Sequence, residues 1–161
     1  DVDLGPYLRL AASLHHVAAG AVMLRADLRE LADQLSDTRD ATRKKAQKAV
    51  GERALEDRLE LVRELVRRLR QEPKRQDDYG QSIGVLAKSS AEVAAEVANL
   101  LRDFDISQVG PALPVRLAVD VDSPTPAIVT LLREWHASDR LPDPARRAIE
   151  EIKGTTGPAA G

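Results

Sequence analysis

Apolar residues at heptad spacing are the feature that most restricts what this chain can fold into. From position 10 to position 35 they recur in alternating steps of four and three residues, at Leu10, Leu14, Val17, Ala21, Leu24, Leu28, Leu31 and Leu35. This spacing places them along one face of an α-helix, which has about 3.6 residues per turn. Gly5 and Pro6 fit its start, because proline suits a first helical position. The sequence predicts a helix over 6–35.

Two later segments repeat the spacing. The second stripe, in a helix expected over 55–72 before Pro73, consists of Leu55, Leu59, Val62, Val66 and Leu69. The third follows a loop expected at 73–80 and consists of Ile83, Leu86, Ser90, Val93, Val97, Leu100 and Phe104. These stripes predict a mainly α protein, with an antiparallel bundle of three long helices over 1–105. The segment 36–54 has helix-forming residues but no stripe, so it is left open as helix or loop.

Composition agrees with helices packed through aliphatic side chains. The chain of 161 residues is 43% hydrophobic and 31% charged, with one Trp, one Phe and two Tyr. It has no cysteine, which excludes disulfides and thiolate chemistry and is compatible with a cytoplasmic location. The longest uncharged run, 10–24, is too short to cross a bilayer, so no membrane span is expected. Abundant alanine, and arginine in excess over lysine, are typical of GC-rich bacteria.

The stretch VRLAVDV at 115–121 interrupts this helical pattern. Apolar and polar residues alternate along it, which is typical of a β-strand whose apolar face is made by Val115, Leu117, Val119 and Val121. A strand needs a neighbour, because its backbone groups are otherwise unpaired. Val2 to Leu4 is one candidate partner within the chain. The rival interpretation is an open edge that pairs with another molecule.

Two proline-started helices follow the expected strand. Thr125 with Pro126, and Asp143 with Pro144, have the pattern of a cap followed by a first helical position. Trp135 ends an apolar stripe, which favours a place in the core of a small domain over a role as a platform for a ligand. We therefore expect a strand–helix–helix domain at 106–153 and a flexible tail or linker at 154–161.

The continuous stripes, the surplus apolar residues of the first helix and the unpartnered strand favour a non-enzymatic role. We expect a protein-interaction, oligomerisation, adaptor or regulatory domain of a larger bacterial protein. Its partner would be another protein or a second copy of the chain, with a homo-oligomer expected. The candidate partner-binding edge is the strand face formed by Val115, Leu117, Val119 and Val121.

Basic residues concentrated at 36–75 support an alternative function. This segment holds thirteen Lys or Arg residues against eight Asp or Glu, although the whole chain has a net charge of −2. The candidate anion-binding side chains are Arg63, Arg67, Arg68, Arg70, Lys74 and Arg75. They could contact nucleic acid or another anionic surface, with binding that weakens as salt rises. A solvated helix face laced with glutamates is the competing interpretation.

Catalytic and metal-binding patterns are not evident. Asp120 and Asp122 at the strand end invite a metal-site hypothesis, which we consider weaker than solvated strand positions. His15 and His16 are adjacent, so on a helix they diverge by about 100° and cannot share one metal ion as histidines at i and i+4 can. His136 has no apparent catalytic partner in the sequence. We therefore expect no catalytic residues, no metal and no cofactor.

Overall fold

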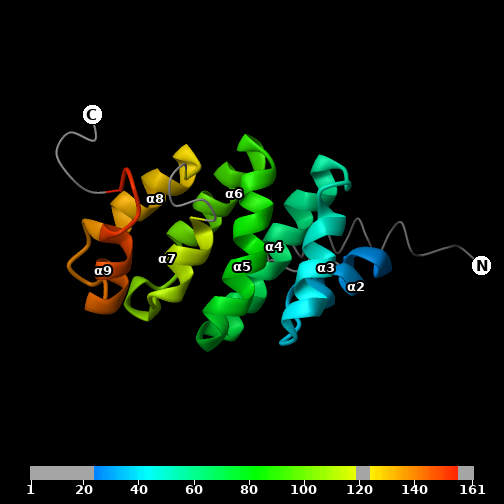
Figure 1. Ribbon diagram of the computed structural model, residues 1–161, viewed down its shortest axis with the longest axis horizontal. Coiled ribbons are helices and arrows are strands. Elements are labelled where there is room, and N and C mark those ends of the chain that lie inside the picture. The colour runs from blue at the N-terminus through cyan, green and yellow to red at the C-terminus, as the bar shows by residue number, and fades with distance from the viewer. Residues whose placement is uncertain (1–23, 119–123, 156–161) are drawn as a thin grey trace, which may run out of the picture.

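The computed structural model describes residues 24–118 and 124–155, and within these ranges all regular structure is helical (Figure 1). The α-helices are α2 (Ala26–Leu35), α3 (Asp40–Val50), α4 (Leu55–Gln71), α5 (Gln76–Ser89), α6 (Ala91–Arg102), α7 (Ala112–Leu117), α8 (Pro126–His136) and α9 (Asp143–Glu150). Two short 3-10 turns, η1 (Pro73–Arg75) and η2 (Ile106–Gln108), lie between them. The expectation of a mainly α protein is confirmed.

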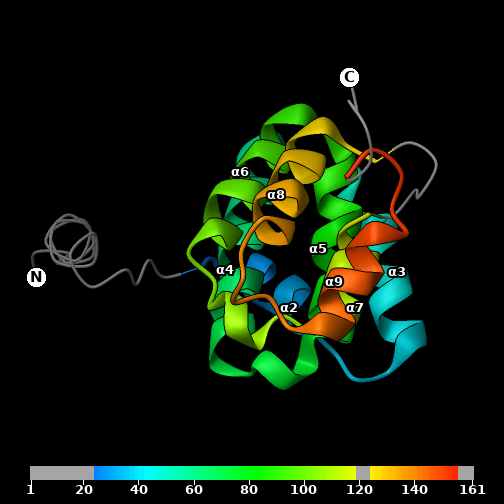
Figure 2. The same cartoon turned by 90° about the vertical axis from the view of Figure 1, so that its left-hand side faces the viewer.

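The helices stack in two rows along the long axis of the molecule. One row runs through α2, α4, α6 and α8, and the other through α3, α5, α7 and α9, with each helix packed on the next member of its row. Figure 1 shows the second row side by side, and Figure 2 shows the rows from the end. The arrangement resembles an α-solenoid, in which helix pairs add along one direction. The structure does not support the expected three-helix bundle.

Three expected helices are present with nearly the expected bounds. α4 buries Val62, Val66 and Leu69 of its stripe, and Leu55 and Leu59 pack against the core from partly buried positions. The helices expected after Pro126 and at Pro144 are α8 and α9, both with proline in their first turn. Of the helix expected over 6–35, only the part from position 24 is described, and there α2 buries Leu28, Leu31 and Leu35.

The third expected helix is two helices, α5 and α6. Ser90 separates them in an extended conformation, and its side chain accepts a hydrogen bond of 3.2 Å from the Val93 backbone N–H. An N-cap of this kind satisfies an otherwise unpaired donor at a helix start. The helical region also begins earlier than expected, since α5 starts at Gln76 inside the segment predicted as loop.

The segment 36–54, left open by the sequence, contains the helix α3. Its buried positions are Arg43, Ala46 and Val50, a stripe that no apolar pattern reveals because one member is charged. Arg43 is held by neighbouring carbonyls and carboxylates, so its burial costs less than that of an isolated charge. A buried arginine therefore supplies part of the inner face of this helix.

The strand predicted from position 115 is wrong where the structure describes it. Residues 112–117 form α7, and Leu113 and Leu117, one helical turn apart, are both buried. Pro114 fits because it lies in the first turn, where backbone N–H groups have no helical acceptor. Val115 is 49% exposed, so Val115 and Leu117 do not share an apolar face. Val119, Val121, Asp120 and Asp122 lie outside the described residues.

Close packing between α5 and α7 joins the regions before and after residue 105. A Cβ atom on Gly80 would lie 3.1 Å from Arg116 Cβ and 3.2 Å from Leu113 Cδ1, so glycine permits this approach. α6 packs on α8 in the other row. Both rows thus continue across the expected boundary at 105, and the division into domains stays a prediction. None of the helices in the described ranges is long and apolar enough to cross a membrane.

Candidate functional site

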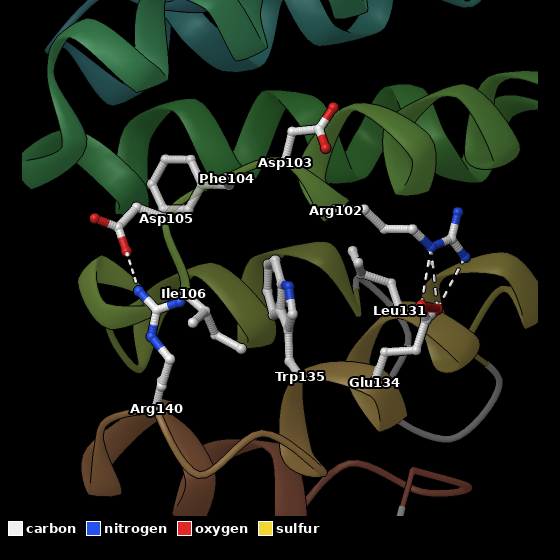
Figure 3. Close-up of a pocket in the computed structure, with 9 residues that line it drawn as sticks. All are labelled: Arg102, Asp103, Phe104, Asp105, Ile106, Leu131, Glu134, Trp135 and Arg140. Carbon is white, nitrogen blue, oxygen red and sulfur yellow. Dashed lines mark hydrogen bonds and ion pairs between the residues drawn. The ribbon is translucent and has the colours of Figure 1, made fainter.

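A pocket of about 510 Å³ opens where the end of α6, the link to η2 and the helix α8 meet (Figure 3). It is lined by Arg102, Asp103, Phe104, Asp105, Ile106, Leu131, Glu134, Trp135 and Arg140. Its size falls in the range of small-ligand and side-chain pockets. Its lining residues come from separate parts of the chain. The pocket therefore forms only when α6 packs on α8.

The floor of the pocket is apolar. Trp135 and Leu131 come from the buried stripe of α8, and Phe104 follows the end of α6. Ile106 begins η2 and is only partly buried. Figure 3 shows the indole ring of Trp135 standing in the middle of the pocket, with Ile106 on one side and Leu131 on the other. Trp135 is thus both a core residue, as expected from the sequence, and part of the pocket wall.

One side of the floor is bordered by a close ion pair between α6 and α8. Arg102 Nε lies 3.1 Å and 3.0 Å from the two carboxylate oxygens of Glu134, and Arg102 Nη1 donates to Asn99 Oδ1 at 2.6 Å. The hydrogen bond to Glu134 raises the pKa of Arg102. The guanidinium donors of Arg102 are therefore directed at groups of the protein itself.

The opposite side is bordered by a much looser pair. Arg140, in the loop between α8 and α9, places Nη2 3.8 Å from Asp105 Oδ1. The same Asp105 oxygen accepts hydrogen bonds from the Ser107 hydroxyl at 2.7 Å and the Ser107 backbone N–H at 3.0 Å. The Ser107 hydroxyl, and then its backbone N–H, lower the pKa of Asp105. Asp105 is therefore stabilised as a carboxylate mainly by Ser107, and only weakly by Arg140.

This arrangement suits non-covalent recognition of an amphipathic group. An apolar group on the floor would contact mainly the partly buried Ile106 and the exposed edge of Trp135, which is only 4% exposed, while polar groups beside it would meet the charged rim. The described residues contain no cluster of three or more His, Asp or Glu side chains able to hold a metal ion. His136 lies outside the pocket lining and pairs with Glu150 at 2.8 Å, which ties α8 to α9. His15 and His16 lie outside the described residues.

Four of the predicted anion-binding residues lie on α4 and contact the protein. Arg63 Nε lies 2.5 Å from Glu96 Oε2 of α6, and Arg70 donates to the Leu100 carbonyl at 2.5 Å. Arg67 and Arg68 both bind Glu64. Burial opposes ionisation of Glu64, but its hydrogen bonds to Arg67 and Arg68 lower its pKa.

The other two anion-binding candidates lie in η1. Lys74 is exposed, and Arg75 donates to the Ser36 carbonyl, pairs with Asp78 at 3.1 Å and lies over the ring of Tyr79. The structure thus brings Arg68 and Arg75 to the end of α2 and directs Arg63 and Arg70 toward α6. Whether the six residues bind anions stays a prediction.

The sequence does not predict this pocket, although Phe104 and Trp135 belong to predicted apolar stripes. Arg102, Ile106 and Arg140 belong to no stripe and no motif, so no local signal distinguishes them. Trp135 was the available hint, because it is the one tryptophan of the chain and has charged neighbours along α8. Its position at the end of an apolar stripe favoured an interpretation as core over one as a ligand platform.

Fold and pocket together define a class: a two-row stack of helices with an amphipathic pocket at the junction of two helices of one row. The chain matches no protein-family model, no curated protein and no solved structure.

Proposed function

We propose that this chain is a non-enzymatic protein-interaction module that binds a peptide segment of a partner protein in the pocket between α6 and α8. The observation that carries the proposal is the apolar floor of Trp135 and Ile106 between two arginine–carboxylate pairs. Tryptophan and arginine are the residue types most often found at the energetic centres of protein interfaces. The wider roles expected from the sequence, as an adaptor or regulatory domain of a larger bacterial cytoplasmic protein, belong to this proposal.

The stacked fold supports an interaction role because it presents a long surface for its size. Stacked helix pairs contact mainly their neighbours, which leaves the rows accessible along their length to an extended partner. A segment anchored in the pocket could continue along α6 or α8. The proposed site replaces the strand edge expected from the sequence, because Val115 and Leu117 lie in a helix with only Leu117 buried.

Selection from a displayed library of random dodecapeptides tests the proposal. We expect the wild-type protein to enrich peptides that share an apolar side chain. Synthetic copies should change the fluorescence of Trp135, which is the one tryptophan of the chain. Ile106→Asp places a charge on the apolar floor and should weaken their binding about tenfold or more, as expected for the centre of an interface.

Val115→Asp is the matched control for this experiment. It makes the same kind of substitution at an exposed β-branched residue that does not line the pocket, and it should leave peptide binding unchanged. Circular dichroism of both variants shows whether each keeps its helices. Failure to enrich any peptide, or equal weakening by both variants, would contradict the proposed function.

A second copy of the chain is the partner that the sequence favoured, and light scattering on a sizing column separates it from a different protein. A mass that stays at 17.6 kDa over a dilution series would exclude the second copy as the occupant of the pocket. A dimer that Ile106→Asp dissociates and Val115→Asp leaves intact would identify it.

A further inference from the structure

The two arginines of the pocket differ in how far the protein itself uses their donors. Arg102 is held by both oxygens of Glu134 and by Asn99, at distances of 2.6 to 3.1 Å. Arg140 has a side chain that is 69% exposed, and its carboxylate contact within the pocket is the 3.8 Å approach to Asp105. A guanidinium gains most from a carboxylate when two of its N–H groups donate at about 2.7–2.9 Å, and Asp105 does not provide that geometry.

Asp105 does not depend on Arg140. Its Oδ1 atom already accepts two hydrogen bonds from Ser107, which form the start of η2. Moving Arg140 toward a ligand would leave these bonds in place, so the change requires no rearrangement of the pocket wall. Arg102 is different, because withdrawing it would leave Glu134 without its partner across the two helices.

Of the two cations in the lining, Arg140 is the one whose donors remain available to a ligand. Glu134 is matched by Arg102, and Asp105 is hydrogen-bonded by Ser107. Asp103 also lines the pocket, but Figure 3 shows its carboxylate directed away from Trp135. In the same view the guanidinium of Arg140 lies beside Ile106, next to the apolar floor.

From this geometry we infer that the bound segment is acidic: it places an apolar side chain on Trp135 and Ile106, and an adjacent aspartate or glutamate on Arg140. The inference rests on the proposed function and specifies the chemistry of the partner. Binding the carboxylate replaces a long contact by a short, charge-assisted one at the edge of a desolvated surface. Arg140 thereby selects acidic segments among those with a suitable apolar side chain.

The dodecapeptides that the wild-type protein enriches are the probes for testing this acidic preference. We expect aspartate or glutamate to be enriched within a few positions of the shared apolar residue. Changing that acid to its amide in a synthetic peptide should weaken binding to wild-type protein about fivefold, the upper range for an exposed ion pair. Arg140→Gln should weaken the acidic peptide by a similar factor and abolish the difference between acid and amide.

Two further variants separate recognition from a general effect on the fold. Arg147→Gln removes the same charge from an exposed position of α9 outside the pocket lining, and should leave the preference for acid intact. Asp105→Asn keeps an oxygen for Ser107 but removes the charge that competes for Arg140, so it should strengthen binding of the acidic peptide. A structural role for Arg140 alone would not produce that gain.

The results distinguish this inference from the proposed function. Peptides that change Trp135 fluorescence and depend on Ile106, but carry no acidic preference or prefer lysine and arginine, would overturn the inference and leave the interaction role standing. Equal binding of acid and amide peptides, or weaker binding to Asp105→Asn, would also overturn it. If no peptide is enriched, both fail together.

Discussion

Two arginines at opposite ends of the molecule, Arg43 and Arg140, differ in how far the fold encloses them. Where α2, α3 and α5 meet, Arg43 has a side chain that is only 5% exposed, and it donates to the carbonyls of Asp37 and Thr38 at 2.9 and 3.0 Å. At the pocket between α6 and α8, Arg140 is 69% exposed and approaches Asp105 only to 3.8 Å. A charged residue type by itself therefore does not indicate whether the side chain is structural or available for binding. Its role follows from whether the fold closes around its donors.

At the end of α2, side-chain donors are needed to pair backbone carbonyls, and buried or partly buried side chains supply them. The last carbonyls of a helix lack backbone partners. Here Ser82 donates to the Leu35 carbonyl and Arg75 to that of Ser36, while Arg43 serves the turn that follows. These arginines are therefore structural parts of the α2–α3 connection, and we expect their removal to change stability more than binding.

The largest expected effect is that of Arg43→Met. The substitution preserves the length of the side chain but leaves the Asp37 and Thr38 carbonyls without their donor and Asp78 without its 3.3 Å partner. Breaking a buried charged network in this way costs about 3 kcal/mol or more. Urea unfolding followed by circular dichroism measures the loss, and peptide binding by the folded variant should not change. A loss below about 1 kcal/mol would show that solvent can hydrogen-bond the Asp37 and Thr38 carbonyls when Arg43 is absent.

Gln76→Leu should cause the next largest loss in the free energy of unfolding, because Gln76 links α5 to the segment between η2 and α7. The buried Gln76 side chain donates to the carbonyls of Pro73 and Gln108 at 2.8 and 2.6 Å and accepts from the Gly110 N–H at 2.7 Å. Leucine leaves these groups unpaired, at a cost of about 2 kcal/mol.

The same unfolding measurement on Asn99→Leu provides the control for Gln76→Leu. Asn99 is an exposed amide of α6 whose side-chain oxygen accepts from Arg102. Its loss should cost about 0.5 kcal/mol or less. Equal costs for the two variants would contradict the role assigned to Gln76.

Tyr79 makes the stability of the protein depend on pH in the alkaline range. Burial, and then its hydrogen bond to Glu72, raise the pKa of Tyr79 to about 12 from the ordinary value of 10.0. Because the folded-state pKa is the higher one, the stabilisation is fully present below pH 10 and is lost as pH rises toward 12. Tyr79→Phe should cost about 1 kcal/mol at pH 8 by removing that hydrogen bond, and much less near pH 12.

The absorbance change of tyrosinate on titration checks this prediction. A Tyr7→Phe background isolates Tyr79, because these are the two tyrosines of the chain. Titration of the folded protein near pH 10 would contradict the burial argument. A difference between wild type and Tyr79→Phe that stays constant from pH 8 to pH 12 would do the same.

The sequence predicted those parts of the fold whose signals are local. α4 and α8 follow from apolar stripes with a proline at one end, and both signals lie within the element itself. The strand prediction failed because a short alternating run also fits a helix: Leu113 and Leu117 are four residues apart, and both are buried. Ser90 is a visible signal in the sequence, since this polar residue inside an apolar stripe is the cap between two helices.

The pocket could not be predicted in the same way, because it is a product of tertiary packing. Arg102, Ile106 and Arg140 come from a helix end, a 3-10 turn and a loop. They meet only when α6 packs on α8, and nothing within each segment shows which of its residues face the others. The density of basic residues along the sequence points instead to α4, where Arg67 and Arg68 bind Glu64.

A small effect on stability is expected at the pocket itself. Arg102 and Glu134 have side chains that are 37% and 47% exposed, so their ion pair is screened by solvent. Arg102→Gln should therefore change the free energy of unfolding by about 0.5 kcal/mol, far less than Arg43→Met. A double-mutant cycle with Glu134→Gln measures the coupling, which should shrink further at high salt. A coupling above about 2 kcal/mol would mean that the pocket rim is held as firmly as the α2 junction. In that case Arg102 would be as much a structural residue as Arg43. Arg140 would then be the one arginine of the pocket lining with donors available to a ligand.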